Sequence, residues 1–287
     1  CAALGDWAEL VARADVDAVV VATINDALAA VTLAAVRAGK PVLVEKPAGR
    51  SAPELRPVAA AARAAGVAVR VGFNHRFHPA LLKARELVDG GAVGPLMFVR
   101  GRYGHGGRVG YDREWRADPA LAGGGELLDQ GVHLIDLTRW FLGDVAAVSG
   151  FAGTFFWDMP VEDNGFVCLH HTGGQVGWLH ASCSEWKNLF CLEIYGKTGK
   201  LQIDGLGGSY GVERLAYYRM LPQMGPPETT IWEYPGEDGS WNAEFRDFES
   251  ATAGHPGLGA TLEDAVAALE VVGAVYAQSA GARSSAA

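Results

Sequence analysis

The chain has 287 residues, of which 49% are hydrophobic and 20% charged, a composition typical of folded domains rather than disordered segments. At roughly 100 to 200 residues per domain, this length predicts about two domains. The 24 basic and 33 acidic residues leave a net charge of −9, which argues against a general nucleic-acid or anionic-membrane surface and favours a small-molecule partner.

Cysteine content and hydropathy indicate a cytoplasmic protein. The 4 cysteines show no CxxC spacing and are too few for a disulfide scaffold, so we expect reduced thiols. The longest apolar stretch, residues 18–38, is interrupted by Asn25, Asp26 and Arg37 and is too polar to span a bilayer; we also expect no signal peptide. The chain opens at Cys1, inside what reads as a helix, so we expect further sequence upstream.

The first seventy residues alternate short apolar runs with helical segments. Continuous β-branched runs at 17–23, 41–45 and 67–71 are typical of strands buried on both faces of a parallel sheet. Between them we expect helices over 26–38 and 51–65, each followed by a glycine. A strand at about every 25 residues predicts right-handed βαβαβ connections, which make half of a doubly wound domain.

A doubly wound sheet binds its ligand beyond the carboxyl ends of its strands, and polar residues follow all three predicted strands. They are Thr23 and Asn25, then Glu45 and Lys46 ahead of Pro47, then Asn74 and Arg76. Loops are commonly polar, but Lys46 directly ends a buried strand and precedes a proline that fixes the local backbone.

The glycine-rich turn of a dinucleotide-binding fold is not found after the first of these strands. Its nearest match, residues 205–211, lies far from any βαβ unit, and we interpret it as a hairpin loop. If the fold is right, the glycine-rich turn lies upstream of Cys1.

From residue 96 onward, short strands and glycine-rich turns replace the βαβ pattern. We expect strands at 96–103, 145–155, 165–171, 176–182, 190–195, 200–203, 215–219 and 229–234, then helices at 241–253 and 261–280. The fold class is therefore α/β plus α+β. Residues 1–73 are the C-terminal half of a doubly wound domain. Residues 74–287 form an α+β domain with a large, mostly antiparallel open sheet, whose last helix we expect to pack back on the first domain.

The most informative segment follows three consecutive glycines, 123–125. Here Glu126, Asp129, His133 and Asp136 share one face of a predicted helix. Asp129 and His133 are four residues apart, so their side chains would be neighbours. The helix N-terminus disfavours an imidazolium and helps keep His133 usable as a base, while Asp129 would orient its ring. The glycines would let backbone approach a ligand closely, or simply form a tight turn.

Three of these side chains suggest one reaction. Oxidising an alcohol requires a base for the hydroxyl proton, a cation for the developing alkoxide and an acceptor for the hydride. His133 is the candidate base, Asp129 its orienting partner, and Lys46 the cation between nicotinamide and substrate. A satisfied core residue is the common alternative for a lone histidine, although an acid one turn earlier argues against it here.

Four motifs occur in order along the chain: Ala-Thr-Ile-Asn at 22–25, Ala-Gly-Lys-Pro-Val-Leu-Val-Glu-Lys-Pro at 38–47, Gly-Phe-Asn-His-Arg-Phe at 72–77 and Gly-Gly-Gly-Glu-Leu-Leu-Asp-Gln-Gly-Val-His-Leu-Ile-Asp at 123–136. Together they resemble the glucose-fructose oxidoreductase / inositol dehydrogenase (Gfo/Idh/MocA) family. The resemblance implies an N-terminal Rossmann domain, NAD or NADP as cofactor, and redox chemistry on a sugar or cyclitol. It also implies a substrate domain whose open sheet forms homodimers or homotetramers.

The resemblance also implies residue roles. These are catalysis by Lys46, Asp129 and His133, and nicotinamide-side contacts from Thr23, Asn25, Glu45 and Pro47. Lys46, and Asn74 and Arg76 after the third strand, are also candidate cofactor-binding residues. Two features depart from the family's pattern. Ile24 stands where proline is common, and the glycine turn and ribose-reading acid are not in this sequence. We therefore expect roughly 50 to 70 residues upstream, the size of the other half of the domain.

The segment 103–116 precedes the predicted catalytic helix and supplies the candidate substrate residues Arg108, Tyr111, Trp115 and Arg116. Arginine can hold a carboxylate or phosphate in a bidentate fashion, so a nucleotide-sugar is also a candidate substrate. A second candidate wall is residues 185–188, where an exposed tryptophan would suit a subunit interface equally well.

Two other classes of function remain open from the sequence. A metal-dependent hydrolase or isomerase would use Glu126, Asp129, His133 and Asp136 as ligands, although we predict no metal site. A non-catalytic sensor would keep the fold and bind a dinucleotide or a sugar without turnover.

Overall fold

The computed structural model describes the backbone of residues 3–285 and the side chains of residues 3–281; Cys1 lies outside the described residues. After a short helix, α1 (Trp7–Ala12), the chain forms a three-stranded parallel sheet in the order β1 (Val19–Val21), β2 (Val42–Glu45) and β3 (Val69–Gly72). Helices α2 (Asn25–Arg37) and α3 (Ala52–Ala65) connect the strands. The predicted βαβαβ unit is confirmed.

The strand and helix signals work as expected. Val42 and Val44 of β2 are fully buried, because helices and neighbouring strands surround this central strand. Helix α3 ends at Gly66, whose φ of 64° is the left-handed conformation that glycine adopts at little cost.

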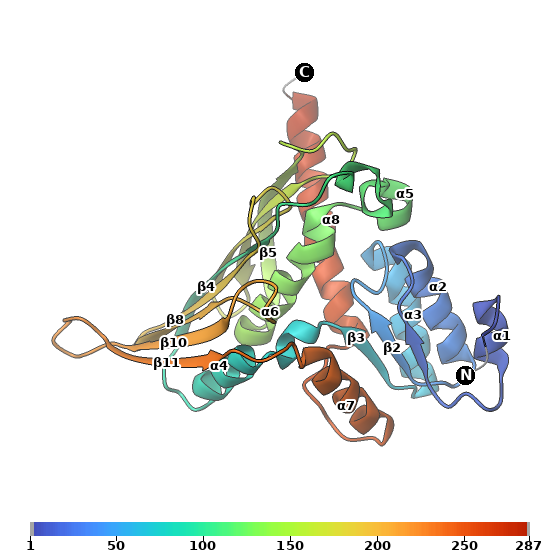
Figure 1. Ribbon diagram of the computed structural model, residues 1–287, viewed down its shortest axis with the longest axis horizontal. Coiled ribbons are helices and arrows are strands. Elements are labelled where there is room, and N and C mark those ends of the chain that lie inside the picture. The colour runs from blue at the N-terminus through green and yellow to red at the C-terminus, as the bar shows by residue number, and fades with distance from the viewer. Residues whose placement is uncertain (1–2, 286–287) are drawn as a thin grey trace.

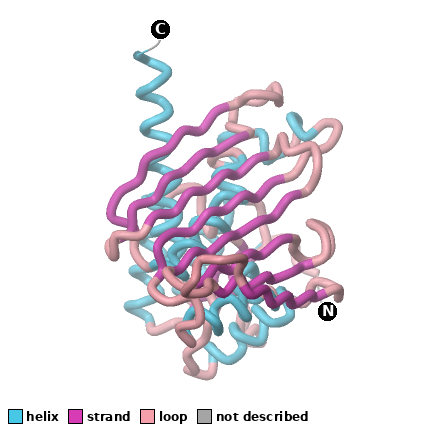
Figure 2. Tube along the Cα trace, turned by 90° about the vertical axis from the view of Figure 1, so that its left-hand side faces the viewer, coloured by secondary structure: helices cyan, strands magenta, loops and turns pink. Residues whose placement is uncertain are grey.

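The second sheet has eight strands in the order β11-β10-β9-β8-β4-β7-β6-β5. Their bounds are β4 (Leu96–Gly104), β5 (Val145–Gly153), β6 (Asn164–His171), β7 (Val176–Ser182), β8 (Leu189–Gly196), β9 (Gly199–Asp204), β10 (Glu213–Arg219) and β11 (Glu228–Tyr234). All neighbours pair antiparallel except β4 and β7, which are parallel. The mostly antiparallel open sheet is confirmed. In Figure 2 this sheet lies in front of the helices, and the described helices do not cover the face that points toward the viewer.

The remaining helices either contact the other face of this sheet or lie between it and the first domain. They are η1 (Asn74–Phe77), α4 (Pro79–Asp89), η2 (Tyr111–Arg113), η3 (Trp115–Ala117), α5 (Pro119–Ala122), the π-helical turn η4 (Leu127–Gly131), α6 (Val132–Leu142), α7 (Ser240–Thr252) and α8 (Leu262–Ser285). Helix α8 runs between the two sheets in Figure 1 and contacts α3, β3, α6 and β5. The last helix therefore reaches the first domain.

The described residues also bear on the expected reduced thiols and on the expectation that no segment spans a bilayer. Cys168, Cys183 and Cys191 carry free thiols. None of the described helices has both the length and the apolar character that a bilayer crossing requires.

Candidate functional site

A cavity of about 200 Å³ lies where the carboxyl ends of β2 and β3 meet the second sheet. Fourteen residues line it: Glu45, Lys46, Gly72, Asn74, His75, His78, Tyr103, Gln130, His133, Leu206, Ser209, Tyr210, Asp238 and Trp241. It lies where a doubly wound sheet binds its ligand. Both parts of the chain build it, because Lys46 directly follows β2 of the first sheet and His133 belongs to α6, a helix on the second sheet.

Lys46, Asp129 and Arg116 form one ion cluster, called here the Lys46 cluster. Lys46 Nζ donates to the backbone oxygen of Asp129 at 2.6 Å and pairs with its carboxylate Oδ1. Arg116 Nε donates to Oδ2 of the same carboxylate at 3.2 Å. Burial acts to raise the pKa of Asp129, but the two cations outweigh it and the pKa is lowered. Asp129 is therefore an anion that fixes Lys46 at the cavity.

His133 is 3% exposed and its ring stacks on that of His75, with centroids 3.8 Å apart. Burial first, and then the charges of Lys46 and His78, hold the pKa of His133 well below its usual range. The imidazole is therefore neutral at neutral pH, as a general base must be.

Asp129 does not orient His133, contrary to the sequence-based expectation. Its carboxylate is engaged by the Lys46 cluster, and His133 Nδ1 has no hydrogen-bond partner. The physical reason is the π-helical turn η4, in which the α-helical i, i+4 alignment does not hold. Stacking on His75 and an edge contact with Phe73 position the ring instead.

The predicted nicotinamide-side residues lie at the carboxyl edge of the first sheet. Thr23 is exposed after β1, Asn25 Nδ2 donates to Ala122 O at 2.9 Å, and Pro47 is buried after a cis peptide bond with Lys46. Burial raises the pKa of Glu45, which lines the cavity beside Lys46.

This edge fits the nicotinamide end of a dinucleotide. Gly72 lines the cavity, and a Cβ there would lie 3.3 Å from Lys46 N, so the glycine lets the ends of β2 and β3 pack closely without a side chain entering the cavity. Across the cavity, the rings of His133 and His75 line the opposite wall, and His133 Nδ1 and His75 Nε2 are buried without hydrogen-bond partners.

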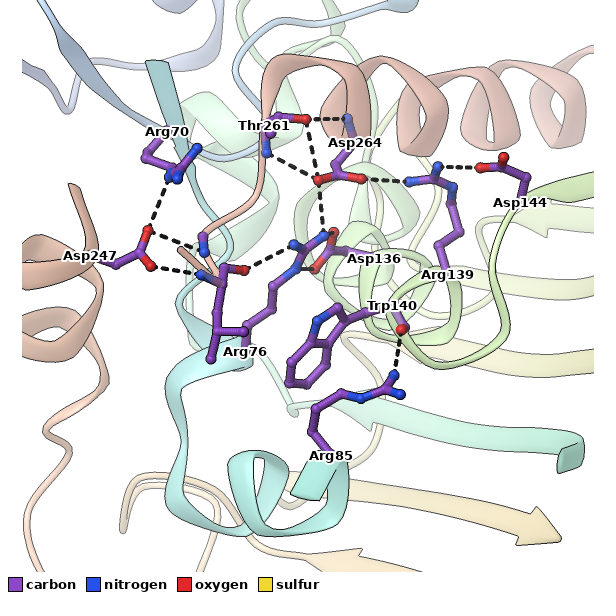
Figure 3. A network of polar contacts seen from close by, with 12 residues as sticks. Arg70, Arg76, Arg85, Asp136, Arg139, Trp140, Asp144, Asp247, Thr261 and Asp264 are labelled. Atoms are coloured by element: carbon purple, nitrogen blue, oxygen red, sulfur yellow. Dashed lines mark hydrogen bonds and ion pairs between the residues drawn. The ribbon is translucent and has the colours of Figure 1, made fainter. Parts of the chain in front are cut away.

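Asn74 and Arg76, both predicted to bind cofactor, have different places. Asn74 lines the cavity and its Nδ2 donates to Ser240 Oγ at 2.8 Å. Arg76 does not line the cavity. It pairs with Asp136 and Asp264 in the network of Figure 3, with Nε to Asp136 Oδ2 at 2.8 Å. Arg76, Asp136, Asp264 and Arg139 are called here the Arg76 network.

Three of the four candidate substrate residues line a cavity, and Arg108 does not. Tyr111, Trp115 and Arg116 line a second cavity with a volume of about 10 Å³, next to Asp129. The Arg116 guanidinium lies over the Trp115 ring, 4.5 Å from its centroid. Arg108 is largely exposed, pairs with Glu114 at 2.7 Å and lines neither cavity.

The three glycines at 123–125 serve tight packing against protein. A Cβ on Gly124 would lie 2.1 Å from Tyr276 Oη, and one on Gly125 would lie 1.9 Å from Glu162 O. Of the two alternatives left open by the sequence, the structure favours the tight turn over the approach of a ligand.

The wall at 185–188 borders a groove of about 600 Å³. Ser209 and Tyr210 line both this groove and the first cavity, so the two spaces are adjacent. Trp186, at 76% exposed, lines neither.

The four acidic and histidine side chains considered as metal ligands do not converge. Asp136 is paired with Arg76, Asp129 belongs to the Lys46 cluster, and His133 stacks on His75. In the part of the chain that the structure describes, no group of three or more His, Cys, Asp or Glu side chains is placed to hold a metal ion.

Comparison with protein families gives two matches that follow the two parts of the fold. Residues 1–73 match the model described as "Oxidoreductase family, NAD-binding Rossmann fold", and residues 81–202 match the GFO/IDH/MocA C-terminal domain. The chain belongs to the GFO/IDH/MocA family. A nicotinamide dinucleotide is therefore the cofactor that its first domain is built to bind.

Curated relatives of this GFO/IDH/MocA protein are dehydrogenases and reductases. It is 30% identical to levoglucosan dehydrogenase of Pseudarthrobacter phenanthrenivorans, over 60% of this chain and 45% of that protein. It is 33% identical to 1,5-anhydro-D-fructose reductase of Ensifer adhaerens, over 67% of this chain and 58% of that protein. The matched region thus spans about half the length of these relatives.

Solved structures share the fold. A levoglucosan dehydrogenase in complex with NADH superposes with a TM-score of 0.86 at 24% identity, covering 97% of this chain and 81% of that one. An oxidoreductase domain protein from Kribbella flavida gives a TM-score of 0.83 at 29% identity, covering 96% and 82%. The Rossmann half and the open-sheet domain of this family member are therefore arranged as in known oxidoreductases.

Sequence reasoning missed several cavity residues of this family member. His75 and His78 lie within or beside a motif that drew attention to Asn74 and Arg76 instead. Tyr210 lies in the 205–211 segment, which is the predicted hairpin loop between β9 and β10 but also closes the cavity. Asp238 and Trp241 come from the start of α7 and carried no motif signal.

Proposed function

We propose that this protein transfers a hydride between NAD or NADP and a hydroxyl-bearing carbon of a sugar, cyclitol or nucleotide-sugar. The observation that carries the proposal is that Lys46, from the dinucleotide-binding sheet, and His133, from the second domain, line one cavity. In this reading, residues 1–73 belong to the cofactor domain and residues 74–287 form the substrate domain. The names of the relatives, which include inositol and anhydro-sugar enzymes, support a ring-shaped polyol as substrate.

The proposed roles follow from charge and burial. The Lys46 ammonium stabilises the developing alkoxide, while Asp129 holds that ammonium in place through two contacts. His133 is neutral and accepts the hydroxyl proton; because its Nδ1 is buried, Nε2 is the nitrogen that faces the cavity. The nicotinamide, when bound, accepts the hydride from the same carbon. Tyr111, Trp115 and Arg116 are the proposed substrate-side residues next to Asp129; the second cavity that they line has room for about one water, so they would act at the edge of the first cavity.

The test is turnover of candidate polyols by the purified full-length protein. Inositols, levoglucosan and, in the reductive direction, 1,5-anhydro-D-fructose are incubated with each of the two cofactors, and the absorbance of the reduced nicotinamide is followed. We expect turnover of at least one of these compounds, and its loss in His133→Ala with an unchanged melting temperature. Equal turnover by wild type and His133→Ala would contradict the proposed base.

We also propose a cytoplasmic homodimer or homotetramer formed through the open sheet face. Phe98, Phe166 and Trp178 are 38%, 38% and 57% exposed and come from the adjacent strands β4, β6 and β7. Exposed apolar patches of this kind commonly mark protein interfaces. Light scattering should give a multiple of the monomer mass, and Trp178→Lys should shift it toward the monomer.

A further inference from the structure

Glu126 is a fully buried carboxyl group with few partners, close to the Lys46 cluster. Its side chain has 0% exposed surface, and its Oε1 has no hydrogen-bond partner. Its Oε2 accepts only a long hydrogen bond, 3.5 Å, from the Tyr111 hydroxyl. Burying an ionised carboxylate without good hydrogen bonds is costly, so this environment favours the neutral acid.

His105 faces Glu126 as a neutral ring. Gly107 N–H donates to His105 Nδ1 at 2.9 Å, so the neutral imidazole carries its hydrogen on Nε2. That nitrogen lies 3.5 Å from Glu126 Oε1. Burial lowers the pKa of His105, so it offers Glu126 a dipole and not a positive charge.

Nine ionisable groups of the described chain surround Glu126. They are Asp129 on η4, Lys46 after β2, Arg116 on η3, Tyr111 on η2, Tyr103 on β4, His105 after β4, Glu162 before β6, Cys183 after β7 and Tyr210 between β9 and β10. Burial, followed by the negative charges of Asp129 and Glu162, raises the pKa of Glu126 well above its usual range, although Lys46 and Tyr111 oppose the change.

We propose that Glu126 is a positioning residue of the Lys46 cluster that acts as a neutral acid. With Glu126 neutral, Lys46 and Arg116 share one counter-charge within the cluster, Asp129, so the cluster itself keeps one positive charge near the alkoxide; Glu45, which also lies beside Lys46, is common to both states of Glu126. An ionised Glu126 would cancel that charge. The inference rests on the proposed function, because only that reaction develops an alkoxide at Lys46.

The test is the pH dependence of kcat/KM for the full-length protein with its cofactor and the inositol or anhydro-sugar it turns over fastest. As the pH rises through the pKa of Glu126, we expect kcat/KM of the wild type to fall on the order of tenfold, because one net charge near Lys46 is lost. The neutral variants Glu126→Gln and Glu126→Met should not show this alkaline fall, whereas Glu126→Asp should keep it. Two neutral variants are used so that a folding defect in one does not end the test.

The matched control is Glu114→Gln, which removes a half-buried carboxyl that pairs with Arg108 on the neighbouring segment; it should keep the wild-type profile. An alkaline fall shared by wild type and both neutral variants overturns this role but leaves the proposed function standing. A wild type that turns over no polyol overturns the proposed function and this role with it.

A second readout needs no turnover. The infrared difference spectrum of wild type minus Glu126→Gln, recorded at neutral pH without substrate, should contain the C=O stretch of a protonated carboxyl group. A difference spectrum with only carboxylate bands would overturn the neutral state of Glu126, whatever the kinetics show.

Discussion

Two buried ion clusters on the same helical segment differ in how completely their charges are paired. In the Arg76 network, the Asp136 side chain is 1% exposed and accepts two bonds from Arg76, which is itself 7% exposed (Figure 3). Arg76 also pairs with Asp264 and donates to Leu258 O. Each of the three guanidinium nitrogens thus has at least one partner within the protein.

The Lys46 cluster, whose Asp129 precedes Asp136 by seven residues, is only partly paired and borders both cavities. Lys46 and Asp129 are 17% and 18% exposed, Lys46 lines the first cavity, and Arg116 and Asp129 line the second. Oε1 of Glu126, beside them, has no hydrogen-bond partner. The same residue types therefore have two roles. A fully paired (closed) cluster holds helices and loops together, whereas a partly paired (open) cluster leaves charge available for chemistry.

The largest expected effect comes from breaking the closed cluster. Arg76→Met leaves Asp136 buried without its counter-charge, which should lower the free energy of unfolding by about 3–5 kcal/mol in chemical denaturation. Asp89→Asn, which removes the exposed partner of the Arg85–Asp89 pair and leaves the Arg85 bond to Trp140 O intact, is the control and should cost about 1 kcal/mol or less. The dissociation constant for NADH should be unchanged in folded Arg76→Met. Weaker NADH binding by this variant would instead support a cofactor-binding role for Arg76.

Opening the other cluster should affect turnover more than stability. Lys46→Met removes the cation of the proposed alkoxide site, and we expect turnover to fall by about 10²–10³-fold. The melting temperature should change little, since Asp129 keeps Arg116. Lys40→Met is the matched control: Lys40 donates to Val16 O at 2.7 Å, so its loss should lower the melting temperature and spare turnover. Near-normal turnover by Lys46→Met would contradict the role of Lys46 as the cation that stabilises the alkoxide.

Acid should weaken the fold through the stacked histidines beside the open cluster. Burial holds the pKa of both His75 and His133 well below the value of about 6.5 that each has in the unfolded chain. Below that pH the unfolded chain binds protons that the folded protein does not, so the free energy of unfolding falls by up to about 1.4 kcal/mol per pH unit for each ring. Urea denaturation at several pH values measures this slope, and His75→Phe should reduce it; an identical slope would contradict the buried neutral state.

The smallest effect on the free energy of unfolding should come from solvent-exposed ion pairs that are far from the proposed catalytic residues. Arg56–Glu270 and Arg63–Glu263 join α3 to α8, and all four side chains are at least half exposed. A double-mutant cycle on Arg63 and Glu263 should give about 0.2–1 kcal/mol, reduced further by salt. A coupling as large as that of Arg76 would mean that exposure does not separate these classes of pair.

Local sequence pattern determined the secondary structure and the domain types of this protein. Strand burial on both faces of β2, the glycine after α3 and the alternating strands of the second domain are properties of short segments, so they can be read without partners. The same is true of Lys46 at a strand end and of the Gly-Gly-Gly segment before His133, whose motifs occur within a few residues.

Only the tertiary structure decided which polar groups meet. Asp129 pairs with Lys46, 83 residues away, rather than with its near neighbour His133, because a π-helical turn changes the alignment. Arg76 is directed to Asp136 and away from the cavity, and Tyr210 reaches the cavity from a hairpin loop. Hydrophobic periodicity reports how much of a segment is buried, whereas the partner of a buried charge depends on distant segments that local pattern does not specify.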